Sequence, residues 1–366
     1  MNATWAAKPS LSIPGSGCQR PALGIRRLEE LLVKELIREL TEEFGPSGSE
    51  DAVRELIKKR ISGQVNEARV DPLGNLIAFK QGRAKRGVQR RKIMLAAHMD
   101  EIGVIISHVD EKGFLRFARV GGVRPLHLLG SRVIFDDGRI GVIGREKPEK
   151  RTEFPVVDKM FIDVGVPGKE QLTKKVGDVA AFVRPFVDLG QRLVAKAFDD
   201  RIGCAVLVQT VLDLETTPHD VYFVFTVQEE LGLRGALTSA FGVEPDAAIA
   251  VDVTGTGDTP EAHPMAVSLG AGPAIKVKDG GMLAHPGIKN WMARTAQRLE
   301  LPHQFEVLEG GTTDAMAIQT SRAGVAAGVL SIPCRYVHSP SEMVDYNDVQ
   351  NAVKLLVGLL RGPVDI

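Results

Sequence analysis

Apolar and polar positions follow one another in two textures along this chain, and each texture predicts a different kind of structure. The first texture combines apolar runs of strand length with apolar residues at helical spacing. Strands that alternate with helices predict an α/β domain, whose mostly parallel sheet is covered by helices on both faces. The expected strands include 221–227, 247–251 and 326–332, together with the run KIMLAAHMDEIGVII. The expected helices are 27–44, 49–61 (capped by Ser49), 201–214, 289–299 and 347–360.

The second texture fills the middle of the chain, where short alternating strands are separated by glycines. The segments are FLRFARVGG, SRVIFDDGRIGVIG, FIDVG and DVAAFVRPFV. They predict a small β-barrel or β-sandwich-like domain over 104–191, inserted into the main fold. The α/β domain is then discontinuous and comprises 27–103 and 192–366. Residues 1–26 carry Pro and Gly without the apolar block of a signal peptide, and we expect a disordered leader there.

Composition excludes several classes of partner. The chain has 46 basic and 46 acidic residues, so its net charge gives no reason to expect nucleic acid or an anionic membrane. No apolar run approaches the roughly 20 residues of a membrane helix. The three cysteines have no paired spacing, which favours a reducing cytoplasm over a disulfide framework.

Two adjacent glutamates, Glu229 and Glu230, end the very apolar run 221–227. Bare carboxylates at the end of a buried strand are costly unless something compensates them. A metal ion bound by one glutamate, beside a proton handled by the other, would provide that compensation. Neighbours on an extended strand face opposite ways, so the chain must turn for both to reach one site. The Leu231-Gly232 step is the expected place of that turn.

Other acids and histidines also follow apolar strands, where open α/β sheets place their sites. They are His98, Asp100, Asp252 and His338, while Asp199 and Asp200 stand just before a helix. Taken singly, each has an ordinary structural explanation, such as a satisfied histidine, a helix cap or a turn. Taken together, these separate explanations would require unpaired acids or histidines to stand at four strand ends by chance.

The residue types indicate which metal chemistry is possible. His98 and Asp100 are two positions apart, so His98 could bind a metal while Asp100 accepts its other ring N–H. Imidazoles and carboxylates without thiolates suit Zn²⁺, Co²⁺ or Mn²⁺. These ligands are too many for one open tetrahedral zinc, and they suit two ions that share a carboxylate and a water. A nearby free carboxylate would then move the proton.

The order of these motifs resembles that of the dinuclear zinc exopeptidases, and their details closely resemble the tetrahedral (TET) aminopeptidases. That family is also known as glutamyl or deblocking aminopeptidases and, in older usage, as cellulase M. The resemblance covers about 28–360. The motifs that carry it are AAHMDEIGV, KAFDDRIGC, VQEELGLRGA, VDVTGTGD, GGTTDA and RYVHSPSE. The long gap between His98 and Asp199, filled by the small β domain, favours this branch over related carboxypeptidases, whose lid domain is inserted later.

The resemblance assigns a role to each matching residue. The implied metal ligands are His98, Asp199, Glu230, Asp252 and His338. Asp199 would bridge the two ions, Glu229 would be the general base, and Asp100 would orient His98. Asp200 is expected to cap its helix or support the ligands. The substrate is expected to contact the residues Gly311, Thr312 and Asp314.

The resemblance thus implies a cytoplasmic, metal-dependent aminopeptidase that removes N-terminal residues from short peptides with two Zn²⁺ or Co²⁺ ions. It also implies dimers, formed through the inserted domain, that assemble into a dodecamer. One alternative is a glycoside hydrolase, because paired carboxylates also serve glycosidases. Two Trp and three Tyr make a poor sugar platform, however. The other alternative is a non-enzymatic assembly scaffold.

Overall fold

The computed structural model describes residues 20–366 except 84, 149 and 151. The predicted leader therefore lies mostly outside the described residues. The first helix, α1, spans Arg20–Glu42 and so begins earlier than the expected start at residue 27. Within the described part of the chain, none of the helices has both the length and the apolar character needed to cross a membrane.

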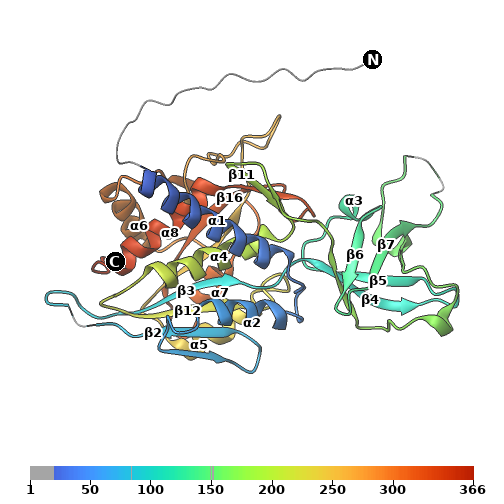
Figure 1. The fold of residues 1–366 in the computed structure, drawn as a ribbon, viewed down its shortest axis with the longest axis horizontal. Coiled ribbons are helices and arrows are strands. Elements are labelled where there is room, and N and C mark those ends of the chain that lie inside the picture. Colours follow the sequence, from blue (N-terminus) through green and yellow to red (C-terminus); the bar gives the residue numbers. More distant parts are fainter. Residues whose placement is uncertain (1–19, 84, 149, 151) are drawn as a thin grey trace, which may run out of the picture.

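The large domain combines seven helices with one mixed sheet (Figure 1). Besides α1, its helices are α2 (Asp51–Arg60), α4 (Phe198–Asp213), α5 (Arg234–Val243), α6 (Pro286–Arg298), α7 (Asp314–Gln319) and α8 (Tyr346–Leu360). In spatial order its main strands are β1 (Glu67–Val70), β2 (Leu76–Lys80), β12 (Asp220–Thr226), β3 (Lys92–His98), β13 (Ala247–Thr254), β16 (Ala326–Arg335), β17 (Glu342–Asp345), β11 (Arg192–Ala195) and β10 (Val187–Asp188). Two further strands, β14 (Ala274–Lys278) and β15 (Gln304–Val307), extend from β16.

Parallel pairing is confined to the centre of the sheet and to the pair β14–β15. The strands β12, β3, β13 and β16 run parallel. Antiparallel strands flank them on both sides, so the sheet is mixed. Thr226 pairs with His98, and Asp252 pairs with Ser331. The carboxyl ends of the central strands consequently meet at one edge, as the predicted α/β class requires.

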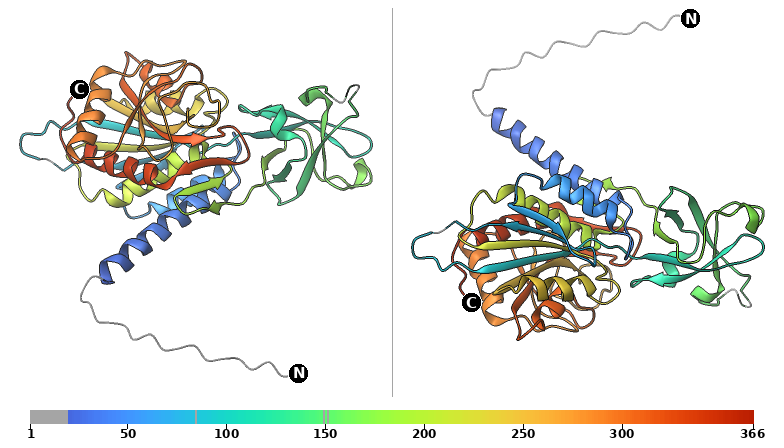
Figure 2. Two further views of the ribbon diagram at one scale, coloured as in Figure 1. Left: turned by 90° about the horizontal axis from the view of Figure 1, so that it is seen from above. Right: turned by 90° about the horizontal axis from the view of Figure 1, so that it is seen from below.

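Helices cover both faces of this sheet, as predicted (Figure 2). On β3, Ile93 and Leu95 point into a core shared with α1, α2, α4, α6 and α8. The residue between them, Met94, points to the opposite side and packs with α5 and α7. This alternation follows from the two-residue period of a strand. Because both faces are buried, each large apolar side chain contributes about 1.5–3 kcal/mol of transfer free energy.

The predicted inserted β domain is a closed barrel that forms a separate lobe (Figures 1 and 2). Its strands, in order around the barrel, are β4 (Gly103–Val109), β5 (Leu115–Val120), β8 (Met160–Asp163), β7 (Ile140–Arg145), β6 (Arg132–Phe135) and β9 (Val179–Phe182). A short helix, α3 (Pro125–Leu128), follows β5. The strand β10 falls inside the predicted insertion 104–191 but pairs with β11 of the large sheet. The exact domain limits remain a prediction.

Candidate metal centre

His98 is the last residue of β3, and its ring is buried. Nε2 lies 3.0 Å from Oδ1 of Asp199. On the other side of the ring, Nδ1 lies 3.1 Å from the carbonyl oxygen of Asp100 and 3.4 Å from Oδ1 of the same residue. These acceptors require the proton on Nδ1, which leaves Nε2 available to a metal ion.

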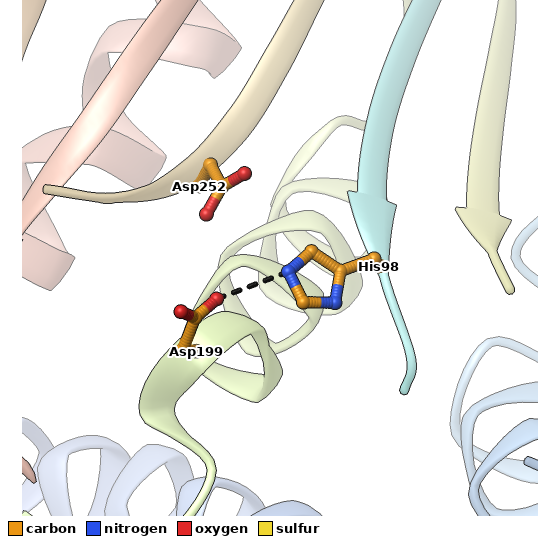
Figure 3. Close-up of side chains that lie close together, drawn as sticks. All are labelled: His98, Asp199 and Asp252. Atoms are coloured by element: carbon orange, nitrogen blue, oxygen red, sulfur yellow. Dashed lines mark hydrogen bonds and ion pairs between the residues drawn. The ribbon is translucent and has the colours of Figure 1, made fainter. Parts of the chain in front are cut away.

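Asp199 stands between the two histidines, at the start of α4. Its Oδ1 faces His98, and its Oδ2 lies 3.2 Å from Nε2 of His338. It therefore belongs to two groups of ligand atoms, in each of which all atoms lie within 4.8 Å of one another. One group adds His98 and Asp252 (Figure 3), and the other adds Glu230 and His338. A carboxylate shared in this way would be placed to contact two ions, if both groups held one.

The donor atoms suit divalent cations in both groups. Oε1 of Glu230 lies 3.2 Å from Nε2 of His338 and is buried without a hydrogen-bond donor. Burial, together with the negative charge of Asp199, raises the pKa of Asp252 to about 8. Such crowding of buried carboxyl groups is relieved by a cation, and ligation by imidazole and carboxylate fits zinc or cobalt.

Glu229 and Glu230 reach the same site because the chain turns directly after β12. Gln228 has a left-handed φ of 55°, so the turn starts before the expected Leu231-Gly232 step, although Gly232 takes part with a φ of 108°. Oε2 of Glu229 lies 4.0 Å from Nε2 of His98, and burial raises the pKa of Glu229 well above its usual range. A carboxylate that lies beside the ligands can accept a proton from a bound water.

Two carboxylates from outside this turn hold its backbone. Asp100 accepts hydrogen bonds from the backbone N–H of Glu229 at 2.9 Å and of Glu230 at 3.2 Å. The hydroxyl of Ser47 donates to the same carboxylate at 2.6 Å. Asp100 thus contacts both glutamates as well as His98, which is a wider role than the sequence suggested.

Glu50 supplies the second of these carboxylates. Its Oε1 accepts from the backbone N–H of Gln228 at 3.1 Å and of Gly48 at 2.8 Å. The prediction that Ser49 caps α2 is wrong, because Glu50 occupies the N-cap position and makes no side-chain cap bond. Its carboxylate instead holds the turn that carries Glu229 and Glu230. No local pattern predicts this contact, since 178 positions separate Glu50 from Gln228.

Glu342 and Asp200 hold the backbones of three further ligands. Glu342 accepts from the backbone N–H of Asp199 through Oε2 and of His338 through Oε1, each at 2.9 Å. Asp200 accepts from the N–H of Gly203 at 3.0 Å, as a helix cap, and from the N–H of His98 at 3.2 Å. Both roles considered for Asp200 are therefore present.

The three residues expected to contact substrate lie on one loop and at the start of α7. Oδ2 of Asp314 accepts the hydroxyl of Thr226 at 2.5 Å, while its Oδ1 is buried without a donor. Burial raises the pKa of Asp314 to about 6, and its charge also raises the pKa of Glu229. Gly311 has a φ of 70° and accepts the N–H of Gly280, and Thr312 donates to Asp279. Their role in binding substrate stays a prediction.

Residues of the barrel also touch this centre, and the sequence did not predict them. The N–H of Gly122 lies 3.2 Å from Oε2 of Glu230. Nδ1 of His127 lies 3.2 Å from the carbonyl oxygen of His338. The adjacent glycines 121 and 122 are a possible sequence sign of close approach, whereas His127 matched no ligand position.

Comparison with known proteins adds an independent finding. The family model described as M42 glutamyl aminopeptidase matches residues 74–355. A putative aminopeptidase of Acetivibrio thermocellus is 48% identical, over 90% of this chain and 99% of its own length. The structure of an aminopeptidase from Desulfurococcus kamchatkensis superposes with a TM-score of 0.86 at 43% identity, covering 91% and 95% of the two chains. The TET1 peptidase of Pyrococcus horikoshii, described as able to assemble into a tetrahedron or a large octahedral shell, has a TM-score of 0.79 at 32% identity, covering 90% and 99%.

Proposed function

The chain belongs to the M42 glutamyl aminopeptidase family and is a metal-dependent aminopeptidase, and we propose that it works with two divalent ions, Zn²⁺ or Co²⁺, in each subunit. It hydrolyses the N-terminal peptide bond of short peptides. Membership of this family decides against the two alternatives considered from the sequence, a glycoside hydrolase and a non-enzymatic scaffold.

The observation that carries the two-ion proposal is the position of Asp199. Its two oxygens face two different histidines, at 3.0 and 3.2 Å. We assign His98 and Asp252 to one ion, Glu230 and His338 to the other, and Asp199 to both. A site for a single ion would leave one of the two histidines without a role.

Each part of the reaction is then assigned to a particular group. Bound ions would lower the pKa of water and polarise the scissile carbonyl. Glu229 takes the proton from the attacking water and delivers it to the leaving amine. Asp100 holds the backbone of Glu229 by accepting the N–H of that residue, and burial raises the pKa of the Glu229 carboxyl above its usual range.

The substrate's N-terminal residue is proposed to bind along the loop that carries Gly311 and Thr312. Asp314 offers a buried carboxylate oxygen without a donor at the end of this loop. A substrate α-ammonium group is a donor of the right charge for it. Two Gly-containing loops meet here, since the N–H of Gly280 donates to the carbonyl of Gly311 at 2.8 Å.

The assembly and the location of the protein are further parts of the proposal. We propose a homo-oligomer in which dimers assemble into a dodecamer. In support, the similar TET1 peptidase is described as able to assemble into a tetrahedron or a large octahedral shell, and the similar PhTET1-12s structure is described as a dodecamer. The exposed side chains of Leu126 and Phe154 place apolar surface on the barrel, which is expected to form the dimer contact. A cytoplasmic location is compatible with the buried free thiols of Cys204 and Cys334.

Two neighbouring substitutions test the assignment. Glu229→Gln should keep both ions but lose nearly all hydrolysis of aminoacyl-anilides, because the proton acceptor is gone. Glu230→Ala should lose metal, because a ligand is gone. Elemental analysis and activity are measured on both purified proteins. Full turnover by the Glu229→Gln protein would refute the role of Glu229 as base.

A further inference from the structure

The loop between β5 and α3 brings the inserted barrel into contact with the metal centre. It presents the N–H of Gly122 to Oε2 of Glu230 at 3.2 Å. It then presents Nδ1 of His127 to the carbonyl oxygen of His338 at 3.2 Å. Glu230 and His338 belong to the same ligand group, which also contains Asp199.

The two glycines of this loop leave no room between the barrel and these ligands. A Cβ at Gly121 would lie 2.6 Å from Oε2 of Glu230, and Gly121 also has a left-handed φ of 74°. A Cβ at Gly122 would overlap the imidazole of His338. Because Gly122 is not in the left-handed region, its need for glycine comes from this close approach and not from its backbone conformation.

His127 acts on the backbone of His338. A carbonyl oxygen can only accept, so Nδ1 of His127 must carry the proton and donate it. His338 has a φ of 61°, a conformation that a residue other than glycine keeps only when its surroundings impose it. Its N–H is held by Glu342 at 2.9 Å and its carbonyl by His127, so both sides of the strained residue are tied.

We propose that the barrel loop builds one of the two metal positions, that of Glu230 and His338, and that His127 is the positioning residue for His338. The inference rests on the two-ion function proposed above. The other position does not depend on the barrel for its protein ligands, because His98 and Asp252 lie on β3 and β13 of the large sheet. Changing the loop should therefore weaken one position and spare the other.

The test uses the full-length chain, stripped of metal by a chelator and dialysed against buffered Zn²⁺. The variants are His127→Leu, which removes the donor, and His127→Asn, whose short amide can still donate. Gly122→Ala is a second variant that displaces the His338 ring without touching His127. His108→Gln is the matched control, because His108 is an exposed histidine on β4 of the same barrel. Bound zinc is counted by elemental analysis and placed by anomalous diffraction.

We expect two ions in the parent protein, in His108→Gln and in His127→Asn. In His127→Leu and Gly122→Ala, affinity should fall about 10-fold to 100-fold at the position of Glu230 and His338 alone. Unchanged affinity in His127→Leu, or an equal loss at both positions, overturns the inference while leaving the two-ion function intact. A parent protein that binds a single ion would instead overturn the two-ion function, and the inference with it.

Discussion

Glu342→Gln tests whether a residue that binds no metal sets the affinity of both ions. Glu342 is 1% exposed, and each of its oxygens accepts one backbone N–H, from Asp199 and from His338. Glutamine has the same size but only one acceptor oxygen. Its amide nitrogen must face one of the two N–H groups, so one hydrogen bond is lost and two donors oppose each other.

The size of the effect follows from that lost bond. A hydrogen bond to a charged group contributes about 1.5–3 kcal/mol net. Because about 1.4 kcal/mol corresponds to a factor of ten, metal affinity should fall by about one to two orders of magnitude. Asp199 belongs to both ligand groups, so we expect a loss at both positions, in contrast to the one-sided loss expected of His127→Leu.

Competition with a chromophoric chelator measures both affinities on the purified chain. Glu170→Gln serves as the control, since it removes an exposed glutamate of the barrel. Affinities within twofold of the parent at both positions, in a Glu342→Gln protein whose circular dichroism is unchanged, would refute the view that Glu342 positions the ligands.

Two further predictions concern stability. Hydrogen bonds from Arg335 hold the pKa of Asp258 well below its usual range, so this pair stabilises the fold above pH about 4, and its contribution is lost as the pH falls further. Chemical denaturation should show Asp258→Asn less stable than the parent at pH 7, with the difference shrinking at pH 3; a constant difference would contradict it. Removal of metal by EDTA should lower the Tm as well as abolish hydrolysis, since an ion at 100 times its Kd stabilises the folded state by about 2.7 kcal/mol. Scanning calorimetry with and without restored Zn²⁺ checks this, and an unchanged Tm would argue against bound metal.

Much of the fold could be predicted from local patterns. The alternation of strands and helices predicted the α/β class. The glycine-separated strands predicted a small inserted β domain, and the structure decided that it is a closed barrel and not a sandwich. Helices with a weak apolar stripe or short length, such as α5 and α7, were missed. The strand pair over 64–82 was recognised from its turn at 71–75, and β1 and β2 form it. The antiparallel edge formed by β17, β11 and β10 was missed, because pairing direction there depends on where the chain returns in space. The cap assigned to Ser49 was wrong because Glu50 serves a distant backbone instead of its own helix.

The candidate site divides in the same way. Acids and histidines at strand ends could be recognised along the chain, since a charged residue after a buried run is locally anomalous. Which carboxylates bind the ligands' backbone could not be recognised. Glu342 and Asp199 are 143 positions apart, and His127 and His338 are 211 apart. Nothing in the sequence around either partner marks such a contact.

The sequence by itself therefore determined the chemistry of this protein: two histidines, a set of carboxylates and the strands that end at them. The tertiary structure decided the geometry. It placed Asp199 between two histidines, turned the chain at Gln228 so that adjacent glutamates share one site, and brought a barrel loop against Glu230 and His338. The physical reason is the distance along the chain over which each kind of interaction acts. Strand and helix periods act over a few residues, whereas a backbone N–H is satisfied by whichever acceptor the folded chain brings within about 3 Å.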